Sequence, residues 1–200
     1  MYIAHRGLHN RTIKENTIPA FIKAINNPLY EGFECDLRET KDKKFVIIHD
    51  FFIANKIISH TNYDELKEYD IPLLEDVLKL DTKKIIVIHI KDNDINISKL
   101  AYMLNNSHKN RYLMANSDTF LKKIKPYAIN FKIGSIKYFY KDVFNYKYYF
   151  YCLINNCLTL DIIDNLEKKK IKIFTFGKII KQYNKNIYYI IDNYQRNVIK

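Results

Sequence analysis

The feature that most constrains the fold is a regular alternation of short β-branched runs and amphipathic stretches along the 200 residues. Eight runs have the length and composition of buried strands, namely Tyr2–His5, Gly32–Leu37, Lys84–Lys91, Tyr112–Ala115, Ile129–Ile133, Tyr148–Leu153, Ile171–Phe176 and Ile187–Asp192. Helical patterns lie between most of them, at Ile18–Ile25 after a Thr17 cap, Leu73–Leu80 after Pro72, Ile97–Leu104 and Leu158–Leu166. Strands that alternate with helices favour a parallel sheet.

Eight such strands predict an α/β fold of the (β/α)8 TIM-barrel type, formed by residues 1–200 as a single domain. Because this fold typically needs about 250 residues, we expect trimmed loops and helices. An open, doubly wound sheet is the alternative architecture. That sheet would need a glycine-rich phosphate loop after its first strand, where this chain has Gly7 alone.

One segment breaks the alternation. Phe45–His49 follows Gly32–Leu37 after the short connection Arg38–Lys44, which is centred on Thr40-Lys41-Asp42. Such a connection has the length of a hairpin and is too short for a crossover helix. We therefore expect a β-hairpin insertion after the second strand, with an extra antiparallel strand folded over the barrel mouth.

Charge and composition narrow the class of protein. The net charge of +11 comes from lysines spread along the chain, without an arginine-rich arm, so we expect small anionic molecules as partners and no nucleic acid. No apolar run approaches the roughly 20 residues of a membrane span, and because Tyr2-Ile3-Ala4 is already strand-like we expect no leader before it. The chain reads as soluble and cytoplasmic. Cys35, Cys152 and Cys157 read as small core residues of a reducing compartment.

Polar residues at the strand ends are the candidates for chemistry. In Glu34-Cys35-Asp36 both carboxylates point to one face of the strand, where they repel each other unless a cation lies between them. That pair suits a hard divalent metal, although an E-x-D pattern alone is more typical of two surface acids on an exposed strand edge. His89 and Lys91 share the face of Val87, which places them inside the barrel near its top.

Two further dipeptides end strands. His5 offers an acid or base, and Arg6 offers a planar fork suited to phosphate. His49 lies beside Asp50, a carboxylate that could orient its ring. The remaining histidines, His9, His60 and His108, have no evident partners and read as surface residues.

The ordered set of these motifs resembles the glycerophosphodiester phosphodiesterase family, whose fold is a phospholipase-C-like barrel. The resemblance is dense over residues 3–91 and faint afterwards. It is carried by Ile3-Ala4-His5-Arg6-Gly7, Glu15-Asn16-Thr17-Ile18-Pro19-Ala20-Phe21, Gly32-Phe33-Glu34-Cys35-Asp36-Leu37, Thr40-Lys41-Asp42, Val46-Ile47-Ile48-His49-Asp50 and Ile71-Pro72-Leu73-Leu74-Glu75-Asp76-Val77-Leu78.

The resemblance implies a hydrolase of lipid metabolism that converts a glycerophosphodiester to glycerol 3-phosphate and an alcohol. His5 and His49 then serve as general base and general acid, and Arg6 and Lys91 bind the phosphate. One divalent metal ion, Mg, Ca or Mn, is held by Glu34 and Asp36.

At the position of the family's third metal ligand, usually a glutamate, this chain has His89. Two interpretations follow. His89 either ligates the metal, which favours Mn, Zn or Fe over calcium, or does not ligate it and leaves a weak or silent barrel that binds phosphodiesters or a partner. A second departure is Phe174-Thr175-Phe176, where many relatives carry a tryptophan in the seventh strand. Tyrosines 148, 149 and 151 are expected to fill the core and the pocket walls.

Overall fold

A computed structural model describes residues 1–108, 110–138, 148–183 and 185–192. The main sheet has eight parallel strands, which a ninth, antiparallel strand extends; the parallel ones are β1 (Tyr2–Ala4), β2 (Tyr30–Glu39), β6 (Ile85–Ile90), β7 (Arg111–Ala115), β8 (Lys132–Lys137), β9 (Phe150–Ile154), β10 (Lys172–Phe176) and β11 (Ile187–Ile191). The helices are α1 (Ile18–Asn26), α2 (Leu74–Leu78), α3 (Ile97–Asn105), α4 (Asp118–Ile124) and α5 (Leu160–Lys168). Single 3₁₀ turns lie at Ile58–His60, Tyr63–Glu65, Lys67–Tyr69, Lys125–Tyr127 and Asn155–Cys157.

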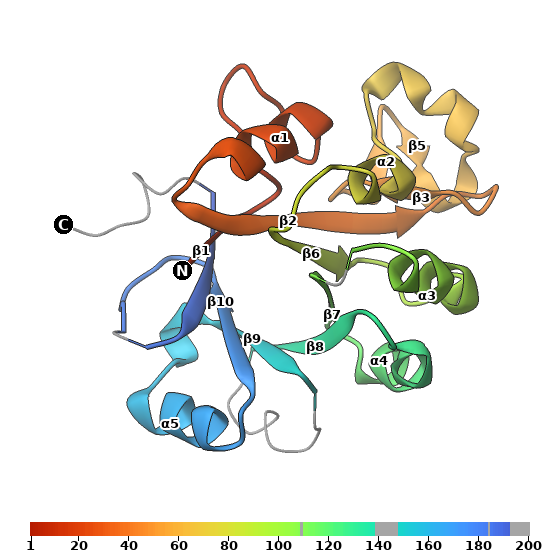
Figure 1. Ribbon diagram of the computed structural model, residues 1–200. Helices are drawn as coiled ribbons and strands as arrows, with labels where there is room; N and C mark the ends of the chain where they lie inside the picture. Colours follow the sequence, from red (N-terminus) through yellow and green to blue (C-terminus); the bar gives the residue numbers. More distant parts are fainter. Residues whose placement is uncertain (109, 139–147, 184, 193–200) are drawn as a thin grey trace.

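The strands close into a parallel barrel. Neighbours pair in the order β1-β11-β10-β9-β8-β7-β6-β2, and β2 pairs back to β1. Figure 1 looks into this ring and shows the helices outside it. The predicted TIM-type barrel is therefore confirmed, and the open doubly wound sheet is excluded. Closure matters for function because it brings the carboxyl ends of all eight strands to one rim.

Strand parity separates two apolar cores as the alternation predicts. Val87, Met114 and Cys152 belong to the cluster that fills the barrel interior. Ile86 and Ile88 belong to the larger cluster between the barrel and its helices. The inward face of β6 therefore carries His89 after Val87, and that of β2 carries Glu34 and Asp36.

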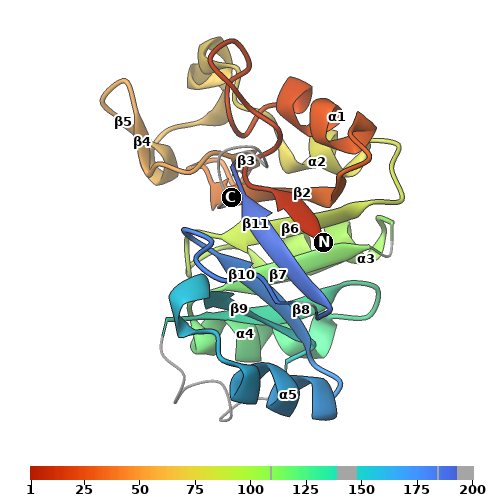
Figure 2. The ribbon, with the colours of Figure 1, turned by 90° about the vertical axis from the view of Figure 1, so that its left-hand side faces the viewer.

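The insertion after the second strand is also confirmed. β3 (Phe45–Ile47) runs antiparallel to β2, with Leu37 opposite Ile47 and Glu39 opposite Phe45. The chain then forms a two-stranded hairpin, β4 (Phe52–Ile53) and β5 (Lys56–Ile57), which projects from the barrel in Figure 2. The insertion has a small core of its own, which consists of Val46, Ile58, Leu66 and Ile71.

The fifth barrel strand starts later than the sequence predicts. Ile129, the first residue of the expected run, is 80% exposed, and β8 extends to Lys137. The cause is local. Helix α4, which the sequence pattern did not mark, continues into a 3₁₀ turn, and the Asn105 side chain accepts hydrogen bonds from the amides of Ile129 and Asn130. These bonds satisfy the backbone in a loop instead of a strand.

Three smaller expectations need correction. Thr17 occupies the N-cap position of α1, but its hydroxyl donates to the Lys14 carbonyl instead of capping the helix. Cys35 and Cys152 are buried, whereas Cys157 is partly exposed, and all three are free thiols. Tyr148 and Tyr151 are buried as expected, but Tyr149 is not.

Within the described part of the chain, no helix has both the length and the apolar character of a membrane span.

Gly32 gives a direct test of the strand pairing that holds the E-x-D strand in place. A Cβ atom added to Gly32 would lie 1.9 Å from the Ile85 carbonyl oxygen on the neighbouring strand. Because that obstacle is backbone, β2 and β6 would have to separate locally. We expect Gly32→Ala to lower the free energy of unfolding by about 3 kcal/mol in a denaturant titration. A loss below about 0.5 kcal/mol, typical of a neutral surface change, would contradict this pairing.

Candidate active site

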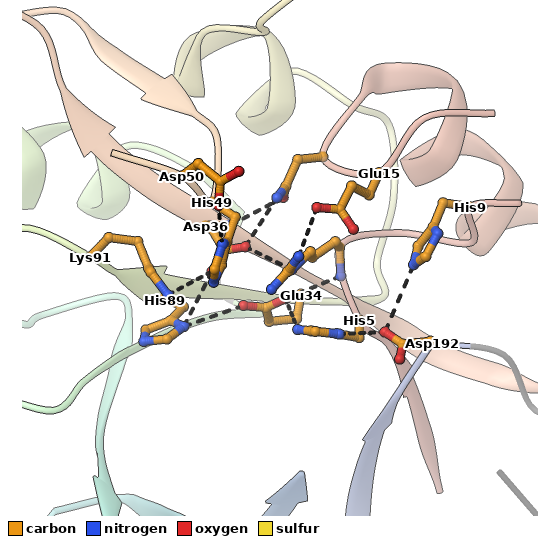
Figure 3. A network of polar contacts seen from close by, with 12 residues as sticks. His5, His9, Glu15, Glu34, Asp36, His49, Asp50, His89, Lys91 and Asp192 are labelled. Atoms are coloured by element: carbon orange, nitrogen blue, oxygen red, sulfur yellow. Dashed lines mark hydrogen bonds and ion pairs between the residues drawn. The ribbon is translucent and has the colours of Figure 1, made fainter. Parts of the chain in front are cut away.

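The barrel rim contains a cavity of about 240 Å³. All seven residues that the sequence singled out for chemistry line it, namely His5, Arg6, Glu34, Asp36, His49, His89 and Lys91. They come from the segment directly after β1, from within β2, from the last residues of β6 and the residue after it, and from the segment that follows β3. Figure 3 shows these side chains from close by, with Glu34 between His5 and His89.

The acidic centre of the cavity consists of Glu34 and Asp36. Both side chains are 1% exposed. Nδ1 of His89 lies 3.7 Å from Oε1 of Glu34 and 3.3 Å from Oδ1 of Asp36. One ligand atom from each of the three residues can be chosen so that all lie within 4.8 Å of one another. Oε1 of Glu34 and Oδ1 of Asp36 accept no hydrogen bond from the described residues.

Burial and mutual repulsion set the protonation of this centre. Burial, together with the neighbouring Asp36 charge, raises the pKa of Glu34 to about 8. Burial acts in the same direction on Asp36, but the His89 imidazole, the Asn16 amide and the Lys91 ammonium outweigh it, so the pKa of Asp36 lies below its usual value. Burial lowers the pKa of His89 below its usual value and outweighs the opposite effect of Asp36.

The loop after β1 supports the acidic centre in a way that the sequence did not predict. Asn16 is 5% exposed, donates from Nδ2 to Oδ2 of Asp36 at 3.0 Å and accepts from the Asp36 amide at 3.2 Å. Arg6 lies 3.2 Å from the same Oδ2 through Nε and 2.7 Å from Glu15 through Nη1. The adjacent Glu15-Asn16 pair was visible in the sequence, but its partners lie in other elements.

His5 has an orienting carboxylate at the other end of the chain. Its Nδ1 lies 2.5 Å from Oδ1 of Asp192, directly after β11, and its Nε2 lies 3.9 Å from Oε2 of Glu34. Burial lowers the pKa of His5, but the hydrogen bond to Asp192 and the Glu34 charge raise it by more than burial lowers it. The pKa of His5 therefore lies above its usual value. His9 also faces Asp192, at 3.8 Å, so the expectation of a partnerless surface histidine is wrong for His9.

His49 enters the cavity from the insertion. Its Nδ1 lies 2.8 Å from Oδ1 of Asp50, the carboxylate that the sequence had placed beside it. Its main-chain carbonyl accepts from Nε of Arg38 at 3.0 Å and from Nη2 at 2.9 Å. His49 and His5 thus reach the same cavity from separate elements.

The rest of the cavity wall is apolar, apart from one phenol. Its residues are Met114, Ile136, Tyr138, Cys152, Phe176 and Ile190. The rings of Tyr138 and Phe176 meet edge to face, with centroids 5.8 Å apart. The cavity therefore offers an acidic centre with three imidazoles, two cationic side chains and one apolar side. This arrangement can bind a divalent cation, hold an anion beside it and transfer protons.

Residues 5–198 match the model of the glycerophosphoryl diester phosphodiesterase family. The chain belongs to this family. Two curated relatives align with part of the chain: an uncharacterised protein of Bacillus subtilis, 35% identical over 106 residues, and a glycerophosphodiester phosphodiesterase of Bacillus altitudinis, 33% identical over 99 residues. These alignments cover 44% and 40% of this chain, and 43% and 40% of the relatives' own lengths.

The barrel itself is shared over almost the full length. A glycerophosphodiester phosphodiesterase from Thermotoga maritima superposes with a TM-score of 0.75, covering 96% of this chain and 93% of that one at 24% identity. The match of the family model to residues 5–198 confirms the family assignment made from the motifs, and it extends beyond residue 91, where the motifs are faint.

Proposed function

We propose that this protein is a metal-dependent phosphodiesterase that hydrolyses a glycerophosphodiester to glycerol 3-phosphate and an alcohol. The observation that carries the proposal is that His5 and His49 line one cavity of about 240 Å³, together with the buried carboxyl groups of Glu34 and Asp36. General acid–base catalysis of phosphodiester cleavage needs two proton-transfer groups at one site, and imidazoles suit neutral pH.

The residues of the acidic centre fit a divalent cation. Oε1 of Glu34 and Oδ1 of Asp36 are buried without a hydrogen bond from the described residues, and the His89 imidazole faces both of them. Unpaired buried carboxylate oxygens are costly unless a proton or a cation neutralises them, and a cation can neutralise both groups at once. Glu34, Asp36 and His89 would hold the metal, which, when bound, polarises the phosphoryl oxygens and neutralises developing charge. Two carboxylates with one imidazole favour manganese, zinc or iron over calcium.

The chain's own residues supply the remaining chemistry. Arg6 and Lys91 line the cavity on either side of Asp36 and attract the anionic phosphodiester. His5 accepts the proton of the neighbouring glycerol hydroxyl, which attacks phosphorus, and Asp192 stabilises the imidazolium that forms. His49 donates its proton to the departing alkoxide. The attack leaves a cyclic phosphate, which water then opens. In this second step His49 is the base and His5 is the acid.

The test is release of glycerol 3-phosphate from glycerophosphocholine and glycerophosphoethanolamine, with magnesium, calcium, manganese and zinc added in turn to chelator-treated protein. We expect turnover with at least one metal and none with chelator alone. Absence of turnover with every metal, together with an unchanged melting temperature on metal addition, would support a silent barrel instead.

A second variant tests whether His89 is a ligand. We expect His89→Glu to shift the metal preference toward calcium and magnesium, because the change adds a charged oxygen donor beside Glu34 and Asp36. The measurement is the rise in melting temperature on titration with each metal, which does not depend on activity. His60→Glu, at an exposed histidine of the insertion, is the matched control. An identical metal profile in the wild type and in His89→Glu would show that the imidazole does not contact the ion.

A further inference from the structure

Arg38 lies one inward-facing position beyond Glu34 and Asp36 on the same strand. It does not line the cavity, and its side chain is 11% exposed. Two of its nitrogens, Nε and Nη2, donate to the main-chain carbonyl of His49 at 3.0 and 2.9 Å. The guanidinium thus binds the main chain of His49, a candidate catalytic residue, and does not line the cavity.

The backbone of His49 depends on this contact. The antiparallel strand β3 ends at Ile47, and the amide of Ile48 makes one more ladder bond, to the Asp36 carbonyl at 2.9 Å. At His49 the chain leaves the sheet. Within the described part of the molecule, the hydrogen bonds found for His49 are those from Arg38 to its carbonyl and that between its ring and Asp50. Asp50 is itself 69% exposed, so it gives the ring no rigid support.

The guanidinium is fixed from its other side. Its Nη1 donates to Oδ1 of Asp92, which follows Lys91 at the end of β6. The second oxygen of Asp92 accepts from the Glu39 amide at 3.4 Å. Arg38 therefore joins the ends of two barrel strands to the segment that carries His49. Only a planar fork with several donors can make these bonds together, so lysine is no substitute.

We propose that Arg38 is a positioning residue, which with Asp92 sets the place of the His49 ring in the cavity. The inference rests on the proposed function for its consequence in catalysis, but the structural part stands alone. A general acid displaced by about 1 Å can lose roughly 10²-fold in rate. Because Arg38 does not touch the cavity, substrate and metal binding should survive its loss.

The kinetic test uses Arg38→Ala, Arg38→Lys and the control Arg11→Ala, which removes an exposed arginine. We expect kcat to fall about 10²-fold in Arg38→Ala, with KM changed less than about 3-fold, and Arg38→Lys to remain impaired. Added methylguanidinium should restore part of kcat in Arg38→Ala, because the small cation can occupy the vacated space beside Asp92. Failure of this rescue, with equal losses in kcat and in metal binding, would indicate a merely structural role and overturn the proposal.

A second measurement separates this proposal from the proposed function. In protein labelled with ¹⁵N at histidine, we expect Arg38→Ala to move the ring signals of His49 and leave those of His5 in place, with assignments from His49→Gln and His5→Gln. Arg38→Lys gives the same comparison if the alanine variant unfolds. Unchanged His49 signals would overturn the proposal whether or not the protein turns over a phosphodiester. Moved His49 signals in a protein without turnover would contradict the proposed function and still support the positioning role of Arg38.

Discussion

Replacing His49 with glutamine is expected to slow hydrolysis of glycerophosphocholine by about 10²–10⁴-fold, and His5→Gln by a similar factor. Glutamine retains much of the size and polarity of imidazole but cannot exchange a proton near neutral pH. Both rings line the cavity, and both are about one-third exposed, so neither substitution removes a core contact. The melting temperature should therefore stay within about 2 °C of the wild type.

The leaving group distinguishes the two roles. A nitrophenolate leaves without protonation, so a substrate with a nitrophenyl ester in place of choline should largely restore the rate of His49→Gln. The same substrate should not restore His5→Gln, because the attacking hydroxyl still needs a base. His60→Gln, at an exposed histidine of the insertion, is the control and should keep full activity. Retention of the wild-type rate on glycerophosphocholine by either variant would exclude that histidine from the mechanism.

The second large effect is expected for Asp36→Asn, which should abolish metal binding and reduce turnover by at least about 10³-fold. Asp36 is 1% exposed. Its Oδ2 accepts a hydrogen bond from Asn16 and pairs with Arg6, while its Oδ1 faces His89. Asparagine keeps the shape but removes the charge that attracts the cation. Its side chain also brings an N–H donor toward Arg6 or the metal position.

Thermal stability gives a measurement that does not rely on activity. A metal present at 100 times its dissociation constant stabilises a protein by about 2.7 kcal/mol, and Asp36→Asn should lose that gain. Asp94→Asn, at an exposed carboxylate shortly after β6, is the control and should retain it. A full metal-induced rise in melting temperature in Asp36→Asn would mean that the ion binds elsewhere.

The prediction of the fold from the sequence succeeded where the signal is local. The alternation along β6 placed Val87 and His89 inside and Ile86 outside, and the structure confirms that division. The short link between β2 and β3 predicted the hairpin for the same reason. The start of β8 was wrong because the amides near Ile129 bond to Asn105, a residue 24 positions earlier that no local pattern indicates.

The sequence alone determined the barrel, the inward pair Glu34 and Asp36, and the family, because side-chain alternation and motif order are properties of consecutive residues. Only the tertiary structure decided which groups support them. Asp192 lies 187 residues from His5, and Asp92 lies 54 residues from Arg38. These pairs exist because a closed barrel brings all its strand ends to one rim, so contacts between distant residues follow from closure and from no pattern along the chain.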